Sequence, residues 1–234
     1  QVGLTEAEVS GALLCLDVTS SIVDEAVEKG CNLIVSHHPL IFRPLKRVVG
    51  ADDVQRAVAK AIKHDITILS MHTNMDNAQG GVNFKMAEKM QLTGVKFFTE
   101  KQVDGITCGS GVMGELPGAM AADDFIMMLK REFDVECVQC NQLLRRPIRT
   151  VAICGGAGSF LLPEAIAAGA DAFVTGEMHY HDYFAHEQEI QIAVIGHYQS
   201  EQYTYEIFKS IIEEQCEGVR CVVTSQNTNP IIYL

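Results

Sequence analysis

Histidine and carboxylate side chains recur at the ends of apolar runs in this sequence. Three such runs, at 33–36, 66–71 and 190–195, are each followed within a few residues by side chains of these two types. The residues concerned are His37, His38, His72, Asp76, His197 and Glu201. Imidazole and carboxylate ligands without thiolate suit zinc, manganese or iron. These residues therefore predict the chemistry of a divalent metal site.

The adjacent residues His37 and His38 need a particular backbone to act together. Neighbouring side chains of a regular strand point to opposite faces, so the two imidazoles converge only if the strand ends there. Pro39 favours that ending, because a proline has no N–H to donate within a sheet. The alternative is one buried and one exposed histidine.

Two further pairs have ordinary alternatives when each is taken alone. His197 and Glu201 are four residues apart at the start of an expected helix, so they share one face and can bind one ion or bridge two. The alternative is a surface pair. Asp76 stands four residues after His72, where a turn-forming aspartate before Gly80 is the alternative. Three strand ends that carry the imidazoles of His37, His38 and His197 and the carboxylates of Asp76 and Glu201 favour the metal site.

The elements that must position these residues alternate between short apolar runs and amphipathic stretches. This alternation is typical of α/β proteins, in which ligands bind beyond the carboxyl ends of the strands. We expect strands at 13–18, 33–36, 66–71, 151–154, 172–175 and 190–195. We expect helices at 21–28, 52–63, 81–90, 121–133 and 199–216, with a loop at 155–159. The glycine-rich loop 155–159 lacks the full spacing of a phosphate-binding motif, so a tight structural turn is the preferred interpretation.

Length and composition set the scale of this fold. The 234 residues are enough for one or two domains, and 47% hydrophobic with 21% charged residues is an ordinary globular composition. The glycine-rich texture from about residue 101 predicts a boundary there. The predicted fold is α/β, with two lobes of mixed sheets flanked by helices and a metal cleft between them. One lobe would comprise 1–100 together with 190–234, and 101–189 would form the inserted second lobe.

Charge and cysteine content exclude several classes of protein. The formal net charge of −12 disfavours binding to a duplex nucleic acid, and no apolar run has the length of a membrane span. Cys15 and Cys154 lie within apolar runs, where buried free thiols are expected. Cys137 and Cys140 have a CxxC spacing, but no second pair completes a zinc site. A reducing cytoplasm fits this pattern best.

Five strings of the sequence resemble the Nif3-like dinuclear metal centre family, whose members are often labelled GTP cyclohydrolase I type 2 homologues. They are Leu-Asp-Val-Thr at 16–19, Ser-His-His-Pro-Leu-Ile-Phe at 36–42, His-Thr-Asn-Met-Asp at 72–76, Thr-Gly-Glu-Met-His-Tyr-His-Asp at 175–182 and Gly-His-Tyr-Gln-Ser-Glu at 196–201. The resemblance covers essentially the whole chain. It implies two divalent ions bound by His37, His38, Asp76, His197 and Glu201, and a ring-shaped homohexamer.

The remaining polar residues near the strand ends have supporting roles in this interpretation. Glu177 and His181 are candidate acid/base residues, although a capping cluster at a helix start is the alternative. His72 and Asp17 are expected behind the ligands, where such residues orient them. Arg43 and Arg47 are the best-placed cations for a substrate phosphate, and a solvated loop explains them equally well.

The resulting functional hypothesis is a cytoplasmic hydrolase that uses metal-bound hydroxide. The resemblance implies a purine nucleotide substrate that is opened at its imidazole ring, as in GTP cyclohydrolase. A metal-dependent nucleotide phosphoesterase would use the same centre. A third alternative is a non-catalytic protein, either a metal carrier or a regulatory interaction protein.

Overall fold

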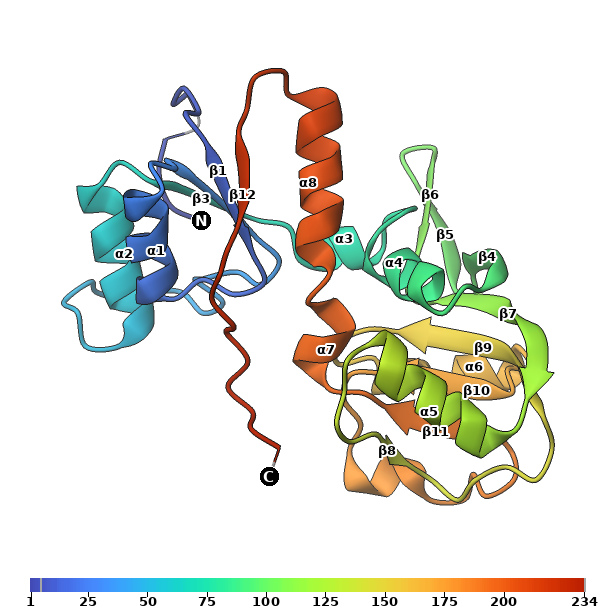
Figure 1. Ribbon diagram of the computed structural model, residues 1–234. Helices are drawn as coiled ribbons and strands as arrows, with labels where there is room; N and C mark the ends of the chain where they lie inside the picture. The colour runs from blue at the N-terminus through green and yellow to red at the C-terminus, as the bar shows by residue number, and fades with distance from the viewer. Residues whose placement is uncertain (5, 234) are drawn as a thin grey trace. The chain divides into compact units, whose positions relative to one another are not determined.

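The chain forms two α/β units (Figure 1). The structure is a computed structural model, which describes residues 1–4 and 6–233. Unit 1 comprises Gln1–Met75 and Thr204–Pro230. Unit 2 comprises Asp76–Tyr203 together with residues 231–233. Unit 2 is thus inserted between two segments of unit 1. The α/β fold class is confirmed.

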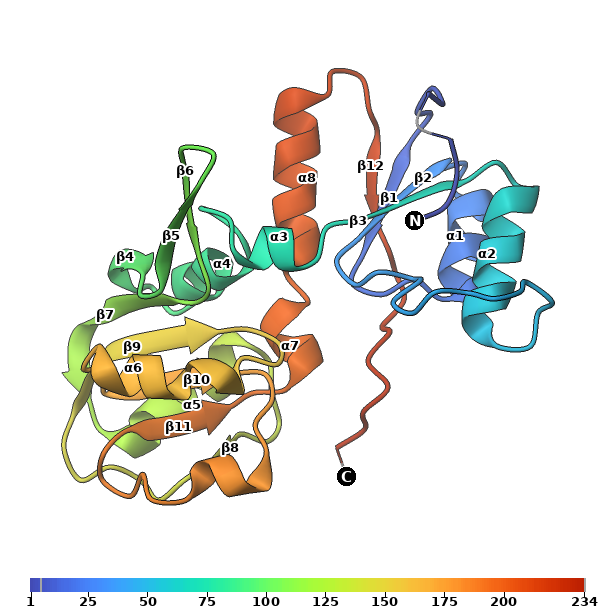
Figure 2. The ribbon, with the colours of Figure 1, turned by 180° about the vertical axis from the view of Figure 1, so that it is seen from behind.

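A four-stranded sheet forms the centre of unit 1, in the order β12-β1-β2-β3. Its neighbouring strands run parallel throughout. The strands are β1 (Ala12–Cys15), β2 (Leu33–Ser36), β3 (Thr67–Ser70) and β12 (Cys221–Val223). The helices are α1 (Ser20–Glu28), α2 (Asp53–Lys63) and α8 (Thr204–Gln215). Figures 1 and 2 show α1 and α2 on one face of the sheet and α8 on the other.

The sequence specifies these helices through their caps and their buried faces. The side chain of Thr19 accepts a hydrogen bond from the backbone N–H of Ile22, and that of Asp52 accepts one from the backbone N–H of Gln55. Helices α1 and α2 therefore both begin with a side-chain cap. Ile22 and Val58 then pack against apolar side chains from β1, β2 and β3 in one core. Because consecutive strands are parallel, their carboxyl ends all meet at one end of the sheet.

Unit 2 contains a six-stranded mixed sheet in the order β4-β7-β9-β10-β11-β8. Strands β9, β10 and β11 are parallel, whereas β4, β7 and β8 pair antiparallel to their neighbours. The strands are β4 (Thr93–Phe97), β7 (Val112–Met120), β8 (Gln139–Cys140), β9 (Ile148–Cys154), β10 (Ala172–Thr175) and β11 (Gln191–Val194). A separate hairpin joins β5 (Glu100–Val103) to β6 (Ile106–Gly109).

The helical segments of unit 2 cover both faces of this sheet. They are α4 (Val82–Lys89), α5 (Ala122–Glu132), η1 (Ser159–Leu161), α6 (Leu162–Ala167), η2 (Tyr180–Tyr183) and α7 (His197–Glu201), and α3 (Thr73–Asp76) ends in this unit. Alternation along β9 separates the cores, since Val151 and Ile153 pack with α4 and α5, while Ala152 and Cys154 pack with α6.

The observed boundaries differ from those expected from the sequence, at 75/76 and 203/204 instead of 100/101 and 189/190. Strand pairing explains the shift. β4 pairs with β7, and β11 pairs with β10, so both strands belong to the sheet of unit 2. The expected helix 199–216 is also divided, because α7 ends at Glu201 and α8 begins at Thr204.

The sequence predictions also concern the lengths of the helices and the state of the cysteines. Within residues 1–4 and 6–233, no helix is long and apolar enough to cross a membrane. All eight cysteines are free thiols, and Cys15 and Cys154 are buried, as expected. Cys137 and Cys140 are exposed, and Cys140 lies in the extended strand β8.

Candidate metal centre

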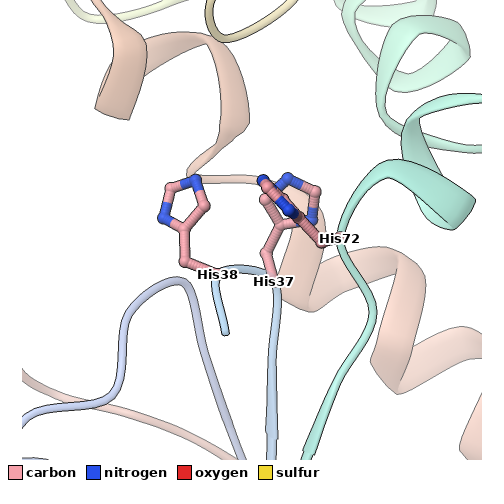
Figure 3. A group of neighbouring side chains, drawn as sticks. All are labelled: His37, His38 and His72. Carbon is pink, nitrogen blue, oxygen red and sulfur yellow. The ribbon is translucent and has the colours of Figure 1, made fainter. Parts of the chain in front are cut away.

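Three histidines meet where β2 and β3 end in unit 1 (Figure 3). β2 ends at Ser36, directly before His37 and His38, and β3 ends at Ser70, two residues before His72. Figure 3 shows all three imidazoles beyond the ends of these strands. Their ring centroids are 5.0 to 5.5 Å apart, and each residue offers a ring nitrogen within 4.8 Å of the others. The adjacent histidines therefore do converge, and the cluster could bind a metal ion.

Hydrogen bonds orient the two adjacent imidazoles. Nδ1 of His37 donates to the carbonyl oxygen of Met71 over 2.9 Å, and Nδ1 of His38 donates to Oδ1 of Asp17 over 2.7 Å. A carbonyl or carboxylate oxygen can only accept, so the Nδ1 atoms carry the hydrogen. A neutral imidazole in this tautomer has its lone pair on Nε2, which is the atom that would bind a metal ion.

His72 belongs to the same group as His37 and His38. The sequence predicts it behind the ligands, but its ring nitrogen is close enough to theirs to be a ligand atom itself. The ring of Phe42 lies edge-on to it, with a centroid separation of 6.4 Å. The sequence does not decide between a ligand and a supporting role for His72. Met71 separates His72 from the end of β3, so the direction of the imidazole depends on the conformation of the backbone after the strand.

A histidine and two glutamates meet in unit 2. His197 and Glu201 stand at the two ends of the single-turn helix α7, and Nε2 of His197 is 3.1 Å from Oε2 of Glu201. Glu177, which follows β10, accepts a hydrogen bond of 2.8 Å from Nδ1 of His197. The contact with Glu201, joined by that with Glu177, raises the pKa of His197 against the opposing effect of burial. Glu177 therefore orients His197 as Asp17 orients His38.

The glycine-rich loop after β9 makes room for these side chains. A Cβ at Gly156 would overlap Oε1 of Glu201, and one at Gly176 would lie 2.9 Å from Cα of His197. The N–H groups of Gly156 and Gly158 donate to the hydroxyls of Ser200 and Thr175. The two donors are therefore used internally, by α7 and by β10, which supports the interpretation as a tight turn.

Asp76 lies near the glutamate of α7 within unit 2. Its backbone oxygen accepts from Asn83, whose side-chain oxygen accepts from Gly155 N–H over 2.8 Å. Burial, followed by the charges of Asp76 and Glu201, raises the pKa of the Cys154 thiol to about 12. The charges of both carboxylates thus act on the same thiol. A protonated thiol is a poor metal ligand, so the donor atoms of this region are oxygen and imidazole nitrogen.

The other predicted site residues lie in different surroundings. His181 is exposed in η2, where its ring packs against Tyr180 and Phe184 at centroid distances of 5.3 and 6.0 Å. Arg43 and Arg47 lie in the exposed loop that follows Phe42. The acid/base role of His181 and the phosphate-binding role of the two arginines remain predictions.

Sequence reasoning missed Thr228, which follows β12 in unit 1. Its hydroxyl donates to Oδ2 of Asp17 over 2.6 Å, so it supports the carboxylate that orients His38. The residue is more than 200 positions from Asp17 in the chain. No local sequence pattern predicts the contact between Thr228 and Asp17. Only the position of the C-terminal segment beside the sheet could have indicated it.

The α/β units and their histidine and carboxylate clusters define a candidate metal-binding protein. Comparison with family models gives a match over residues 1–230 to Duf34/NIF3 (NGG1p interacting factor 3). The chain belongs to this family. Two bacterial relatives share the name "GTP cyclohydrolase 1 type 2 homolog". The Clostridium perfringens protein is 30% identical over 100% of this chain and 89% of its own length, and the Streptococcus pneumoniae protein is 32% identical over 77% and 68%.

Solved structures show the same fold. A hypothetical protein from Staphylococcus aureus superposes with a TM-score of 0.91 at 28% identity, covering 100% of this chain and 90% of that one. A Bacillus cereus protein related to NIF3 superposes with a TM-score of 0.89 at 24% identity, covering 100% and 92%. At this sequence identity, the similarity to the Bacillus cereus protein concerns the fold alone.

Proposed function

We propose that this protein is a metal-dependent hydrolase that binds two divalent ions. The proposed ligands are the residues identified in the sequence: His37, His38, Asp76, His197 and Glu201. The observation that carries this proposal is the hydrogen bond that Nδ1 makes in His37, His38 and His197. In each, Nδ1 donates to a protein oxygen at 2.7 to 2.9 Å, so Nε2 is the ring nitrogen that would bind a metal ion.

The residues of the chain would divide the work in the following way. Divalent ions lower the pKa of water and polarise the group under attack. Asp17 and Glu177 hold the imidazoles of His38 and His197 in one tautomer and one orientation. Gly156 leaves space for the carboxylate of Glu201, which would be one of the groups that hold the ions. His72 is a further candidate ligand beside His37.

For the reaction we propose hydrolytic opening of the imidazole ring of a purine nucleotide. The support is the family membership together with the name that the bacterial relatives carry. The net charge of −12 does not oppose a phosphorylated substrate, because two divalent ions would add four positive charges at the carboxylates that bind them. We extend the proposal to a homohexamer in the cytoplasm, a reducing compartment in which eight free thiols are expected to persist.

Metal-loaded protein incubated with a nucleotide panel tests this function. We expect turnover of GTP with ring opening, detected by the loss of purine absorbance, and we expect its loss in His37→Ala and Glu201→Ala. His64→Ala is the matched control, since His64 is exposed at the end of α2. Phosphate release without ring opening would contradict the proposed reaction in favour of a phosphoesterase. Bound, exchangeable metal without any turnover would indicate a metal carrier.

A further inference from the structure

A pocket of about 300 Å³ lies beside His197 within unit 2. It lies at the carboxyl ends of β10 and β11, because Gly176 and Glu177 follow the first strand and Gly196 and His197 follow the second. Small ligands bind at this end of parallel strands in α/β proteins. The volume is at the lower end of the range for small-molecule pockets. The pocket is therefore of a size for one ring system or a similarly compact group.

Two residues of the segment 231–233 form part of the pocket wall. Ile231 and Tyr233 line it, whereas Ile232 between them is 80% exposed. The phenol oxygen of Tyr233 lies close to the backbone of Gly196, where an added Cβ would be 3.0 Å from it. Tyr233 is 37% exposed, so its ring still has surface that a ligand can cover.

The pocket has the chemistry of a site for an uncharged ligand. Among the described residues that line it, there is no lysine or arginine, and Glu177 contributes a carboxylate. A phosphate group would meet this negative charge without a side-chain cation of fixed charge. Ser159 and Gln139 offer neutral hydrogen-bonding groups, while Ile231 and Tyr233 offer apolar surface. Neutral polar groups combined with an aromatic ring suit a flat heterocycle, which stacks on one face and forms hydrogen bonds at its rim.

We propose that this pocket binds the uncharged planar heterocycle of the substrate, with the ring against Tyr233 and one rim beside His197. The proposal rests on the proposed function and deepens it, because it assigns the heterocycle and not the phosphates to the surroundings of a metal ligand. It makes Tyr233 and Ile231 residues that determine specificity. It also separates the two hydrolase reactions, since ring opening needs the heterocycle near the ions and phosphoester hydrolysis needs the phosphate there.

Titration calorimetry with guanosine tests the pocket without a phosphate group on the ligand. We expect guanosine to bind the full chain both before and after metal removal with a chelator. Tyr233→Ala is expected to weaken binding by about tenfold, because it removes the aromatic ring on which the base would stack. Ile232→Ala is the matched control, since this neighbour in the same segment is exposed, and its affinity should equal that of the wild type.

Each outcome bears on the pocket separately from the hydrolase activity. Loss of guanosine binding in Tyr233→Ala but not in Ile232→Ala supports the proposal, even if no nucleotide is turned over. The proposal would be overturned by no guanosine binding to wild-type protein, by equal affinity in Tyr233→Ala, or by displacement of guanosine from metal-free protein by inorganic phosphate. Turnover of GTP with an unchanged KM in Tyr233→Ala would overturn the pocket while leaving the hydrolase intact.

Discussion

Thr228 and Asp17 are joined by a hydrogen bond of 2.6 Å, in which the threonine hydroxyl donates to Oδ2 of the carboxylate. The other carboxylate oxygen accepts from Nδ1 of His38 over 2.7 Å. A residue near the C-terminus thus supports a carboxylate near the N-terminus, which in turn orients a proposed metal ligand. Partners of this kind fix the tautomer and the direction of a ligating imidazole.

This chain of contacts predicts a graded loss of metal affinity. Asp17→Ala should lower the affinity for a divalent ion by about 10- to 100-fold, as is usual for the loss of a partner behind a ligating histidine. Thr228→Val should have a smaller effect in the same direction, while Thr228→Ser keeps the hydroxyl and should match the wild type. Competition with a chromogenic chelator measures all three. Equal affinity of Asp17→Ala and wild-type protein would contradict the orienting role.

Glu177 is predicted to act through His197. Glu177→Ala should reduce metal affinity by about 10- to 100-fold, because the imidazole loses the acceptor that fixes its tautomer. His179→Ala is the matched control, since His179 also lines the pocket and is exposed, yet its position is not a proposed ligand. If Glu177→Ala kept full metal affinity while its kcat fell, the acid/base role would be favoured over the orienting one.

The close packing at Gly176 predicts a destabilised unit 2 after a small substitution. A Cβ there would lie 2.7 Å from both the Gly156 carbonyl oxygen and the Ser200 hydroxyl oxygen. Gly176→Ala should therefore lower the free energy of unfolding by about 1 to 3 kcal/mol, as overpacking does. Gly118→Ala is the control, because nothing lies within 4 Å of its added Cβ, and a change within about 0.5 kcal/mol is expected. Urea denaturation measures both variants.

Acid sensitivity of unit 1 follows from Glu25 on α1. Burial raises the pKa of this carboxyl, but hydrogen bonds from Ser225 and Thr224 outweigh it and hold the pKa below its ordinary value. The lowered pKa means that this stabilisation is present above the unfolded-state pKa and is lost as the pH falls through the folded-state pKa.

Glu25→Gln tests this acid sensitivity. At neutral pH it should cost about 1.5 to 3 kcal/mol, the range for hydrogen bonds to a charged group. The cost should shrink in acid, where the wild-type carboxyl is also protonated. Glu28→Gln on the same helix is exposed and serves as the control. Thermal unfolding followed from pH 7 down to pH 3 gives the comparison, and a cost that is independent of pH would contradict it.

Particular residues show how far the sequence predicts this structure. The spacing of His197 and Glu201 and the proline after His38 place these side chains correctly at a helix turn and at a strand end, because both features depend on local backbone geometry. The roles of His72, Glu177 and Thr228 depend on contacts between distant segments. The observed unit boundaries differ from the expected ones for the same reason. The pairing of β4 with β7 and of β11 with β10 depends on both partner strands and cannot be read from one strand alone.

The central claim is that the chain binds divalent ions through the oriented imidazoles. Inductively coupled plasma mass spectrometry of purified protein, after incubation with zinc, manganese or iron and removal of free metal, tests it most directly. The account predicts about two ions per wild-type chain, the same content in His64→Ala, and a clear loss in His38→Ala and His197→Ala with unchanged circular dichroism. Wild-type protein that retains none of these metals, or histidine variants that retain the full content, would contradict the account.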